Sequence, residues 1–348
     1  MKPSFSKTAK IKIMAFALFV AAFLMTACGR DNLRIINSAD TAMGTVIVQC
    51  IYASQETSAD KEILDIIDGM ETDELSWRLE SSEVSVINSR AGLSEGTELS
   101  EGLRRILEDC LEVSESSGGA FDITIGGVTE LWNIDTFSGM EDSEYILPGQ
   151  EEISEALNNT GYEKIEIDKG IIYLPQGMSI DLGAVGKGMA LDRIRDYLED
   201  DSSVYAAVIS VGGSILTYGD KPDGTAWSIG ITDPFDTTRS LGMVSVCGSM
   251  CISTSGDYER YVEVDGVRYH HIIDPGTGYP ADSGVHSVTI ITENGMYSDA
   301  LSTACFVLGE EKGLELAEKY NAEALIVSED GKISMTEGMK KIFSLSNQ

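Results

Sequence analysis

Hydroxyl, imidazole and carboxylate side chains gather in one stretch of the sequence, residues 253–278. The stretch reads Ser253-Thr254-Ser255-Gly256-Asp257-Tyr258 and, after a gap, His271-Ile272-Ile273-Asp274-Pro275-Gly276-Thr277-Gly278. Glycine, proline and small polar residues at this density indicate chain reversals that expose backbone N–H groups, where binding and catalytic residues are often found. We therefore interpret the stretch as two strands and turns that handle a ligand.

His271 is the residue of this stretch best suited to accept a proton. It is one of only three histidines in the chain. An imidazole with an ordinary pKa near 6.5 can activate a hydroxyl nucleophile at neutral pH, and the rate should then fall as the pH drops through about 6.5. Two alternatives stay open, because Asp274 could be the base or could orient the loop, and His271 could be a structural residue bonded to a backbone carbonyl.

Asp299 and Thr303 are spaced to hold a hard cation. They are four residues apart in the segment 298–308, which is predicted to be helical, so their oxygens lie on one face a single turn apart. Carboxylate and hydroxyl oxygens suit Mg²⁺. We expect that the Asp299 side chain can be removed without disturbing the fold. The alternative is that Ser298 caps this helix and Asp299 complements its dipole.

The segment 181–188 has the composition of an anion-binding turn. Glycines at 183, 186 and 188 lead into a predicted helix, and Lys187 lies among them. Backbone N–H groups at a helix N-terminus bind phosphate, and the lysine adds a point charge. The glycine spacing is not that of the dinucleotide-binding fingerprint. We therefore predict a phosphate site outside a doubly wound fold.

The elements that must position these residues mix strands and helices without a regular alternation. Strands are predicted at 45–52, 204–210, 227–231, 285–292, 324–327 and 332–335, a strand pair at 241–253, a hairpin at 165–174, and helices at 61–75, 99–116, 189–199, 298–308 and 312–320. Many of the strands are linked as hairpins, which favours an α+β fold with more than one largely antiparallel sheet and flanking helices. No linker rich in proline and serine divides the chain, so we expect a single domain.

The first 27 residues have the pattern of a signal peptide. Lysines precede an apolar segment, residues 13–25, and Met25-Thr26-Ala27-Cys28 resembles a lipoprotein cleavage site. The apolar segment is shorter than the roughly twenty residues that a spanning helix needs. We predict a signal peptide at 1–27, a lipidated Cys28 with a tether at 28–37, a domain at 38–345, and extracytoplasmic attachment to the cell membrane. The alternative is a plain secreted protein.

The net charge of the chain argues against nucleic acids as partners. It has 25 basic and 57 acidic side chains and a formal charge of −32, which becomes −36 when residues 1–27 are removed. Such a surface disfavours nucleic-acid binding.

Apart from Cys28, the chain has an odd number of cysteines, and they lie in apolar segments. We therefore predict that they are small core residues and do not form a disulfide framework. These cysteines are Cys50, Cys110, Cys247, Cys251 and Cys305.

Several motifs together resemble those of the ApbE family over residues 38–345. They are Met43-Gly44-Thr45, Gly119-Ala120-Phe121-Asp122, the segment 181–188, Val211-Gly212-Gly213, Ser255-Gly256-Asp257-Tyr258, the segment 271–278, and Asp299-Ala300-Leu301-Ser302-Thr303-Ala304. The resemblance implies a T-fold-like single domain in a bacterial lipoprotein that transfers the FMN part of FAD to a threonine hydroxyl of another protein, forming a phosphoester and releasing AMP. It implies Mg²⁺ as the metal and extracytoplasmic subunits of membrane redox complexes as acceptors.

The resemblance also implies roles for individual residues. The catalytic residues would be His271 and Asp274, and the metal would bind the carbonyl of Ala184 with Asp299 and Thr303. The implied cofactor contacts are Met43, Arg78, Ala120, Phe121, Asp122, Asp181, Lys187 and Ile272. Family members often carry a tyrosine where Arg78 stands here beside Trp77, so either residue could stack on the cofactor, and Met43 and Phe121 could instead be core residues. The alternative function is FAD storage, or hydrolysis of FAD to FMN and AMP without a protein acceptor.

Overall fold

The computed structural model describes residues 33–138 and 145–346, and its centre is an antiparallel sheet of eight strands in the order β1-β2-β6-β7-β10-β13-β14-β15. The bounds of these strands are β1 Arg34–Ala42, β2 Thr45–Ala53, β6 Val204–Val211, β7 Ser214–Tyr218, β10 Met250–Gly256, β13 Val285–Thr292, β14 Glu323–Ser328 and β15 Ile333–Met335. Strand β2 shows why the sequences of the central strands are continuously apolar: both of its faces are buried. Ile47 and Ile51 enter the core on one face, whereas Cys50 and Tyr52 enter a second core on the other.

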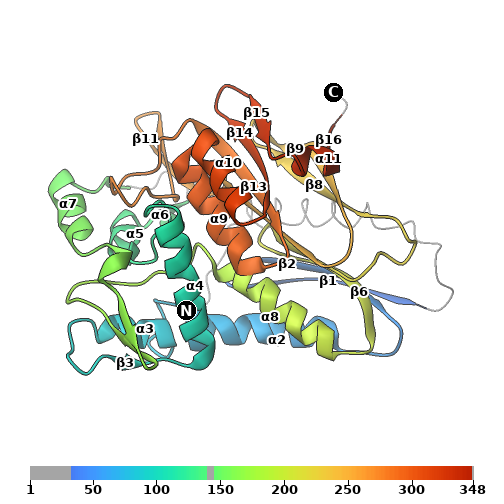
Figure 1. Ribbon diagram of the computed structural model, residues 1–348, viewed down its shortest axis with the longest axis horizontal. Helices are drawn as coiled ribbons and strands as arrows, with labels where there is room; N and C mark the ends of the chain where they lie inside the picture. The colour runs from blue at the N-terminus through green and yellow to red at the C-terminus, as the bar shows by residue number, and fades with distance from the viewer. Residues whose placement is uncertain (1–32, 139–144, 347–348) are drawn as a thin grey trace.

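Helices cover the first face of the large sheet. Helix α9 packs against α8 and β13 (Figure 1). It also packs against β10, and α8 packs against β7. The bounds of the helices on this side are α2 Ala59–Gly69, the π-helical turn η1 Met70–Leu75, α4 Glu101–Ser116, α8 Gly186–Asp200, α9 Gly295–Leu308 and α10 Glu310–Lys319. Their apolar faces and the sheet share one continuous core.

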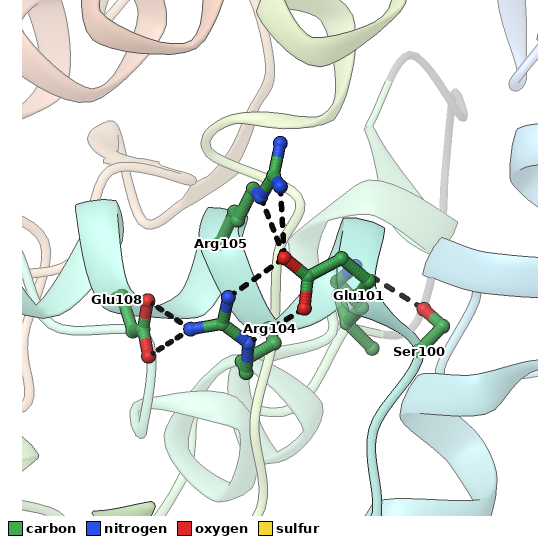
Figure 2. Close-up of polar contacts among 6 residues, drawn as sticks. Ser100, Glu101, Arg104, Arg105 and Glu108 are labelled. Carbon is green, nitrogen blue, oxygen red and sulfur yellow. Dashed lines mark hydrogen bonds and ion pairs between the residues drawn. The ribbon is translucent and has the colours of Figure 1, made fainter. Parts of the chain in front are cut away.

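Helix α4 shows how the sequence places one face toward this core. Leu103, Leu107 and Cys110 recur at helical spacing and are buried. On the outer face Glu101 pairs with Arg104 and Arg105, and Arg104 also pairs with Glu108 (Figure 2). The Ser100 hydroxyl accepts a hydrogen bond from the Leu103 N–H and caps the first turn.

A three-stranded sheet in the order β16-β9-β8 covers the second face of the large sheet. Its strands are β8 Trp227–Asp233, β9 Asp236–Val246 and β16 Phe343–Leu345, and the short helix α11 Met339–Ile342 precedes β16. Tyr52 of β2 and Trp227 of β8 meet in this core with ring centroids 6.0 Å apart. The protein therefore consists of a helical layer, a large sheet and a small sheet.

Smaller elements build one side of the molecule, where α5, α6 and α7 lie opposite β8, β9 and β16 (Figure 1). A third core joins them to the hairpin β11–β12, with Trp132 and Ile273 among its buried residues. The bounds of all the smaller elements, inside and outside this third core, are α3 Glu83–Ser89, α5 Gly126–Trp132, α6 Ile134–Phe137, α7 Gln150–Asn158, η2 Tyr162–Lys164, β3 Thr97–Glu98, β4 Glu166–Asp168, β5 Ile171–Tyr173, β11 Tyr261–Val264 and β12 Val267–His270.

The predicted α+β class with largely antiparallel sheets and flanking helices is confirmed. The boundary of the tether was wrong, because residues 34–37 already belong to β1, which pairs with β2 along its whole length. The strands predicted as a pair at 241–253 are separate, since β9 pairs with β8 and β16 while β10 pairs with β7 and β13. Pairing between distant strands depends on tertiary contacts that a local pattern does not contain.

Four of the cysteines are core residues as predicted. Cys50, Cys110, Cys251 and Cys305 are buried, but Cys247 is exposed just after β9, and all five are free thiols.

The predicted signal peptide and Cys28 lie outside the described residues. Among the helices of residues 33–138 and 145–346, none has the length and hydropathy needed to cross a membrane.

Candidate functional site

A single pocket collects nearly all the residues that the sequence singled out. It lies where the β1–β2 turn, the start of α8, the middle of α9 and the turns after β10 and β12 meet. Its lining includes Met43, Arg78, Ala120, Phe121, Asp122, Asp181, Ala184, Lys187, His271, Ile272, Asp299 and Thr303, together with Trp77. Segments separated by up to 260 positions in the chain thus converge on one site.

A close helix crossing brings the glycine-rich turn to Asp299. Gly188 at the start of α8 and Gly295 at the start of α9 are in backbone contact, since a Cβ on Gly188 would lie 2.0 Å from the Gly295 carbonyl oxygen. The Gly188 N–H donates to Asp299 Oδ2 at 2.6 Å. Only glycine permits this approach. The crossing therefore places Lys187 and Asp299 in the same pocket.

The predicted metal ligands offer a set of oxygens in this pocket. Asp299 is 3% exposed, and its carboxylate also accepts a hydrogen bond from the Ser214 hydroxyl at 2.8 Å. Thr303 lies one turn further along α9, and Ala184 is exposed in the turn before α8. One carboxylate, one hydroxyl and one carbonyl fit Mg²⁺, which commonly takes one or two carboxylates and completes its shell with substrate phosphates and water.

No group of three His, Cys, Asp or Glu side chains suited to a metal occurs in the described part of the chain. A site that relies on substrate phosphates does not require one. The alternative in which Ser298 caps α9 was wrong. The helix begins at Gly295, Asn294 accepts the capping bond from the Tyr297 N–H, and Ser298 is buried with its hydroxyl bonded to Ser253.

Asp122 and Asp181 organise the turns that carry them. Asp122 accepts hydrogen bonds from the N–H and hydroxyl of Thr124 and from the N–H of Tyr162. Asp181 accepts from the N–H of Gly183 at 2.8 Å. Burial raises the pKa of both carboxyls, more than these hydrogen bonds lower it. Each therefore binds a proton more readily than a surface aspartate.

His271 is held by the backbone of the turn that precedes β11. Its Nδ1 donates to the carbonyl oxygen of Arg260 at 3.2 Å, which leaves Nε2 as the basic nitrogen of the neutral ring. Burial, and next the charge of Arg260, lower the pKa of His271 well below its usual value of 6.5. Its neighbour His270 is buried away from the pocket and bonds through Nε2 to the carbonyl of Ala281.

Asp274 does not line the pocket, so the prediction that it acts as a catalytic base is not supported by its position. Its carboxylate accepts from the Gly276 N–H at 2.8 Å, and its own N–H donates to the Tyr279 carbonyl. It faces an adjoining groove formed with residues 115–120 and α10. The other role considered for Asp274, orienting the loop, agrees with these bonds.

Comparison with known proteins agrees with this geometry. A model of the ApbE family matches residues 43–326. The chain belongs to the ApbE family. The FAD:protein FMN transferase of Treponema pallidum (strain Nichols) is 33% identical over 332 residues, covering 89% of each chain. The solved ApbE protein of Thermotoga maritima has 35% identity, a TM-score of 0.79, and coverage of 89% of this chain and 99% of its own. The flavin transferase ApbE of Vibrio cholerae has 28% identity, a TM-score of 0.77 and the same coverage.

Trp77 and Arg78 both reach the site of this ApbE-family chain. The Arg78 guanidinium lies over the Trp77 ring at 4.1 Å from the centroid. Asp135 of α6 lies between two cations, with Arg260 at 2.9 Å and Arg78 at 3.9 Å. The two stacking candidates are thus layered on each other, and Asp135 connects them to Arg260, whose carbonyl holds His271.

The sequence did not single out four charged residues that line the pocket: Glu71, Asp135, Glu259 and Arg260. Glu259 and Arg260 directly follow the Ser255–Tyr258 motif, so extending the motif by two residues would have found them. Glu71 and Asp135 lie in segments where acidic residues are common and no motif surrounds them. Only the tertiary structure identifies these two.

Proposed function

We propose that this chain transfers FMN from FAD to a threonine hydroxyl of an acceptor protein, with Mg²⁺ as the cofactor and AMP as the leaving product. The enzyme class and the use of FAD follow from the ApbE family. The threonine acceptor, the metal and AMP release are our extension. The observation that carries the extension is that His271, with Nδ1 bonded to the Arg260 carbonyl, lines the same pocket as Asp299 and Thr303.

The proposed chemistry is a displacement at the FMN-side phosphorus of FAD. The threonine oxygen forms a bond to that phosphorus, and the bond from the phosphorus to the bridging pyrophosphate oxygen breaks. His271 Nε2 takes the hydroxyl proton, and AMP leaves with the bridging oxygen. A neutral imidazole fixed through Nδ1 is suited to this role because the lone pair on Nε2 is free at neutral pH.

The pyrophosphate would lie between the start of α8 and Asp299. Lys187 and the free N–H groups at the α8 N-terminus would bind the phosphate oxygens there. When bound, Mg²⁺ supplies charge neutralisation at the pyrophosphate oxygens. Such a cation is needed because carboxylates outnumber cationic side chains around the pocket. The carboxylates are Glu71, Asp122, Asp135, Asp181, Glu259 and Asp299, and the cations are Arg78, Lys187 and Arg260.

Intact-mass analysis tests the function directly. The purified protein is incubated with FAD, Mg²⁺ and an acceptor domain that bears a Ser/Thr-Gly-Ala-Ser/Thr site. Transfer adds the mass of FMN less one water to the acceptor and releases AMP in equal amount. AMP and free FMN with an unmodified acceptor would support the FAD hydrolase alternative, and unchanged FAD would support storage.

We also propose that the protein is a lipoprotein, anchored through Cys28 on the extracytoplasmic side of the membrane, where subunits of membrane redox complexes are its acceptors. The support is the order of basic, apolar and small residues before Cys28. A lipidated cysteine with two or more acyl chains gives stable membrane attachment. This placement would bring the pocket to acceptor domains on the same membrane surface.

A further inference from the structure

Met43 is held in a backbone conformation that side chains rarely adopt. It forms the first of the two residues that connect β1 to β2, with φ of 49°, and Gly44 follows with φ of 65°. A two-residue hairpin of this kind favours asparagine, aspartate or glycine at the first position. A methionine there is strained, and strained backbone of this kind persists only where surrounding contacts hold it.

The contact that holds this turn comes from the π-helical turn η1. The carboxylate of Glu71 accepts a hydrogen bond from the Met43 N–H at 3.0 Å. The π-helical bond from the Ser76 N–H to the Glu71 carbonyl belongs to the same turn. Departures to π-helix inside α-helices often accompany functional sites. The carboxylate therefore satisfies a backbone donor that a two-residue hairpin leaves free.

The side chain of Met43 reaches the proposed phosphate site. Its Cε lies 3.3 Å from the position that a Cβ on Gly186 would take, and Leu75 of η1 lies 3.7 Å from the same point. Gly186 is the first residue of α8. Met43, Glu71 and Leu75 all line the pocket. The turn η1 thus fixes both the backbone of Met43 and the packing beside its thioether.

We propose that Glu71 is a positioning residue for FAD binding, which acts by holding Met43 in its left-handed conformation against the start of α8. This proposal rests on the proposed function, because FAD is the ligand that Met43 would contact. Glu71 itself does not take part in the chemical step. Its effect should therefore appear in the affinity for FAD and not in the turnover of bound FAD.

The first test measures FAD binding by fluorescence, with the full-length protein and no acceptor. Glu71→Ala should raise the Kd for FAD about tenfold, and Glu71→Gln should recover most of the affinity since its amide oxygen still accepts the bond. Asp73→Ala is the matched control, because it removes the same charge from the exposed side of the same turn. Transfer at saturating FAD should change less than about twofold. An unchanged Kd in Glu71→Ala, or an equal rise in Asp73→Ala, would overturn the proposal.

A double-mutant cycle separates positioning from a direct contact with FAD. Glycine adopts the left-handed conformation without strain, so in a Met43→Gly background the further change Glu71→Ala should raise the Kd less than about twofold. If Glu71→Ala weakens binding equally in both backgrounds, Glu71 acts on FAD without Met43 and the proposal fails.

A ligand-free measurement keeps this test independent of the proposed function. With methyl-labelled methionine, the Met43 resonance is identified by its loss in Met43→Gly. It should move toward the position of a mobile methionine in Glu71→Ala but not in Asp73→Ala. An unmoved resonance would overturn the positioning role. Failure of the native protein to bind FAD would instead overturn the proposed function, and the resonance would still decide the role of Glu71.

Discussion

His271 and Arg260 are connected twice, once through the backbone and once through charge. The Nδ1–H of His271 donates to the Arg260 carbonyl at 3.2 Å, which fixes the tautomer that leaves Nε2 basic. Burial, and next the charge of the Arg260 guanidinium, lower the pKa of His271. Asp135 pairs with that guanidinium at 2.9 Å and limits its effect. Arg260 therefore fixes the orientation of the proposed base and adds to the effect of burial on its protonation.

Replacing His271 tests its role as the base. His271→Ala should lower the rate of FMN transfer by about 10²- to 10⁴-fold, the usual contribution of a positioned general base, while the affinity for FAD changes little. Asp274→Asn is the comparison, because Asp274 faces the adjoining groove and its replacement keeps an oxygen for the Gly276 N–H. It should cost less than about tenfold. A larger loss in Asp274→Asn than in His271→Ala would reverse the assignment.

The dependence of the rate on pH tests the charge environment of His271. The lowered pKa keeps the ring neutral at mildly acidic pH, so kcat/KM for FAD should stay level from pH 7.5 to about 5, and not fall near 6.5 as the sequence alone predicted. Arg260→Gln keeps the backbone carbonyl but removes the positive charge, and it should move the acid limb to higher pH. An acid limb near 6.5 in the native enzyme would show that neither burial nor Arg260 perturbs the base.

Residues in compact motifs could be predicted from the sequence because their chemistry is local. Asp181 to Gly188 contains its own turn glycines, and Asp299 and Thr303 need only a helix to share a face. Five strands of the large sheet, β2, β6, β13, β14 and β15, could be predicted from apolar runs, whereas β1 and β7 were not among the predicted strands. Partners of β9 and β10 could not, since strand pairing is set by distant segments.

Glu71 and Asp135 could not be predicted for a different reason. The chain contains 57 acidic residues. The residues next to a carboxylate in the sequence do not show whether it accepts a hydrogen bond from a distant backbone N–H or is exposed to solvent. Glu71 bonds to a residue 28 positions earlier, and Asp135 pairs with Arg260, 125 positions later. Their significance arises only when the helices and hairpins pack.

Asp299 should be essential for transfer, and its two replacements should separate metal binding from folding. Asp299→Asn removes the charge but keeps an oxygen for the Gly188 N–H, so activity should fall more than about 100-fold at limiting Mg²⁺ with little change in melting temperature. Asp299→Ala leaves that buried N–H unpaired and should cost about 1–3 kcal/mol of stability as well. The expectation that Asp299 can be removed without disturbing the fold is therefore revised. Normal turnover of Asp299→Asn at limiting Mg²⁺ would place the metal elsewhere.

The lipid anchor is tested at Cys28. Cys28→Ala should release the protein from the membrane or leave it as an unprocessed precursor, because the predicted lipidation site is lost. Membrane fractionation and the mass of the N-terminal peptide report the outcome. Cys247→Ala is the matched control, since Cys247 is the exposed thiol of the described chain and follows Cys28 by 219 positions in the sequence. Unchanged membrane retention and unchanged peptide mass in Cys28→Ala would contradict the lipoprotein proposal.

Gly188, where α8 crosses α9, should be the glycine near the pocket that least tolerates replacement by a larger residue. Gly188→Ala would place a Cβ 2.0 Å from the Gly295 carbonyl oxygen, so the helices must separate, and we expect a loss of at least about 1–3 kcal/mol in the free energy of unfolding. Gly69→Ala is the control, because Gly69 ends α2 in helical conformation with no atom within 4 Å of its Cβ position. That change should be neutral or stabilising by up to about 1 kcal/mol. Chemical denaturation measures both. The separation should also move Asp299 from Lys187, so Gly188→Ala should bind FAD more weakly at temperatures where it remains folded. Equal stability of the two variants would show that the crossing is looser than the described backbone contact.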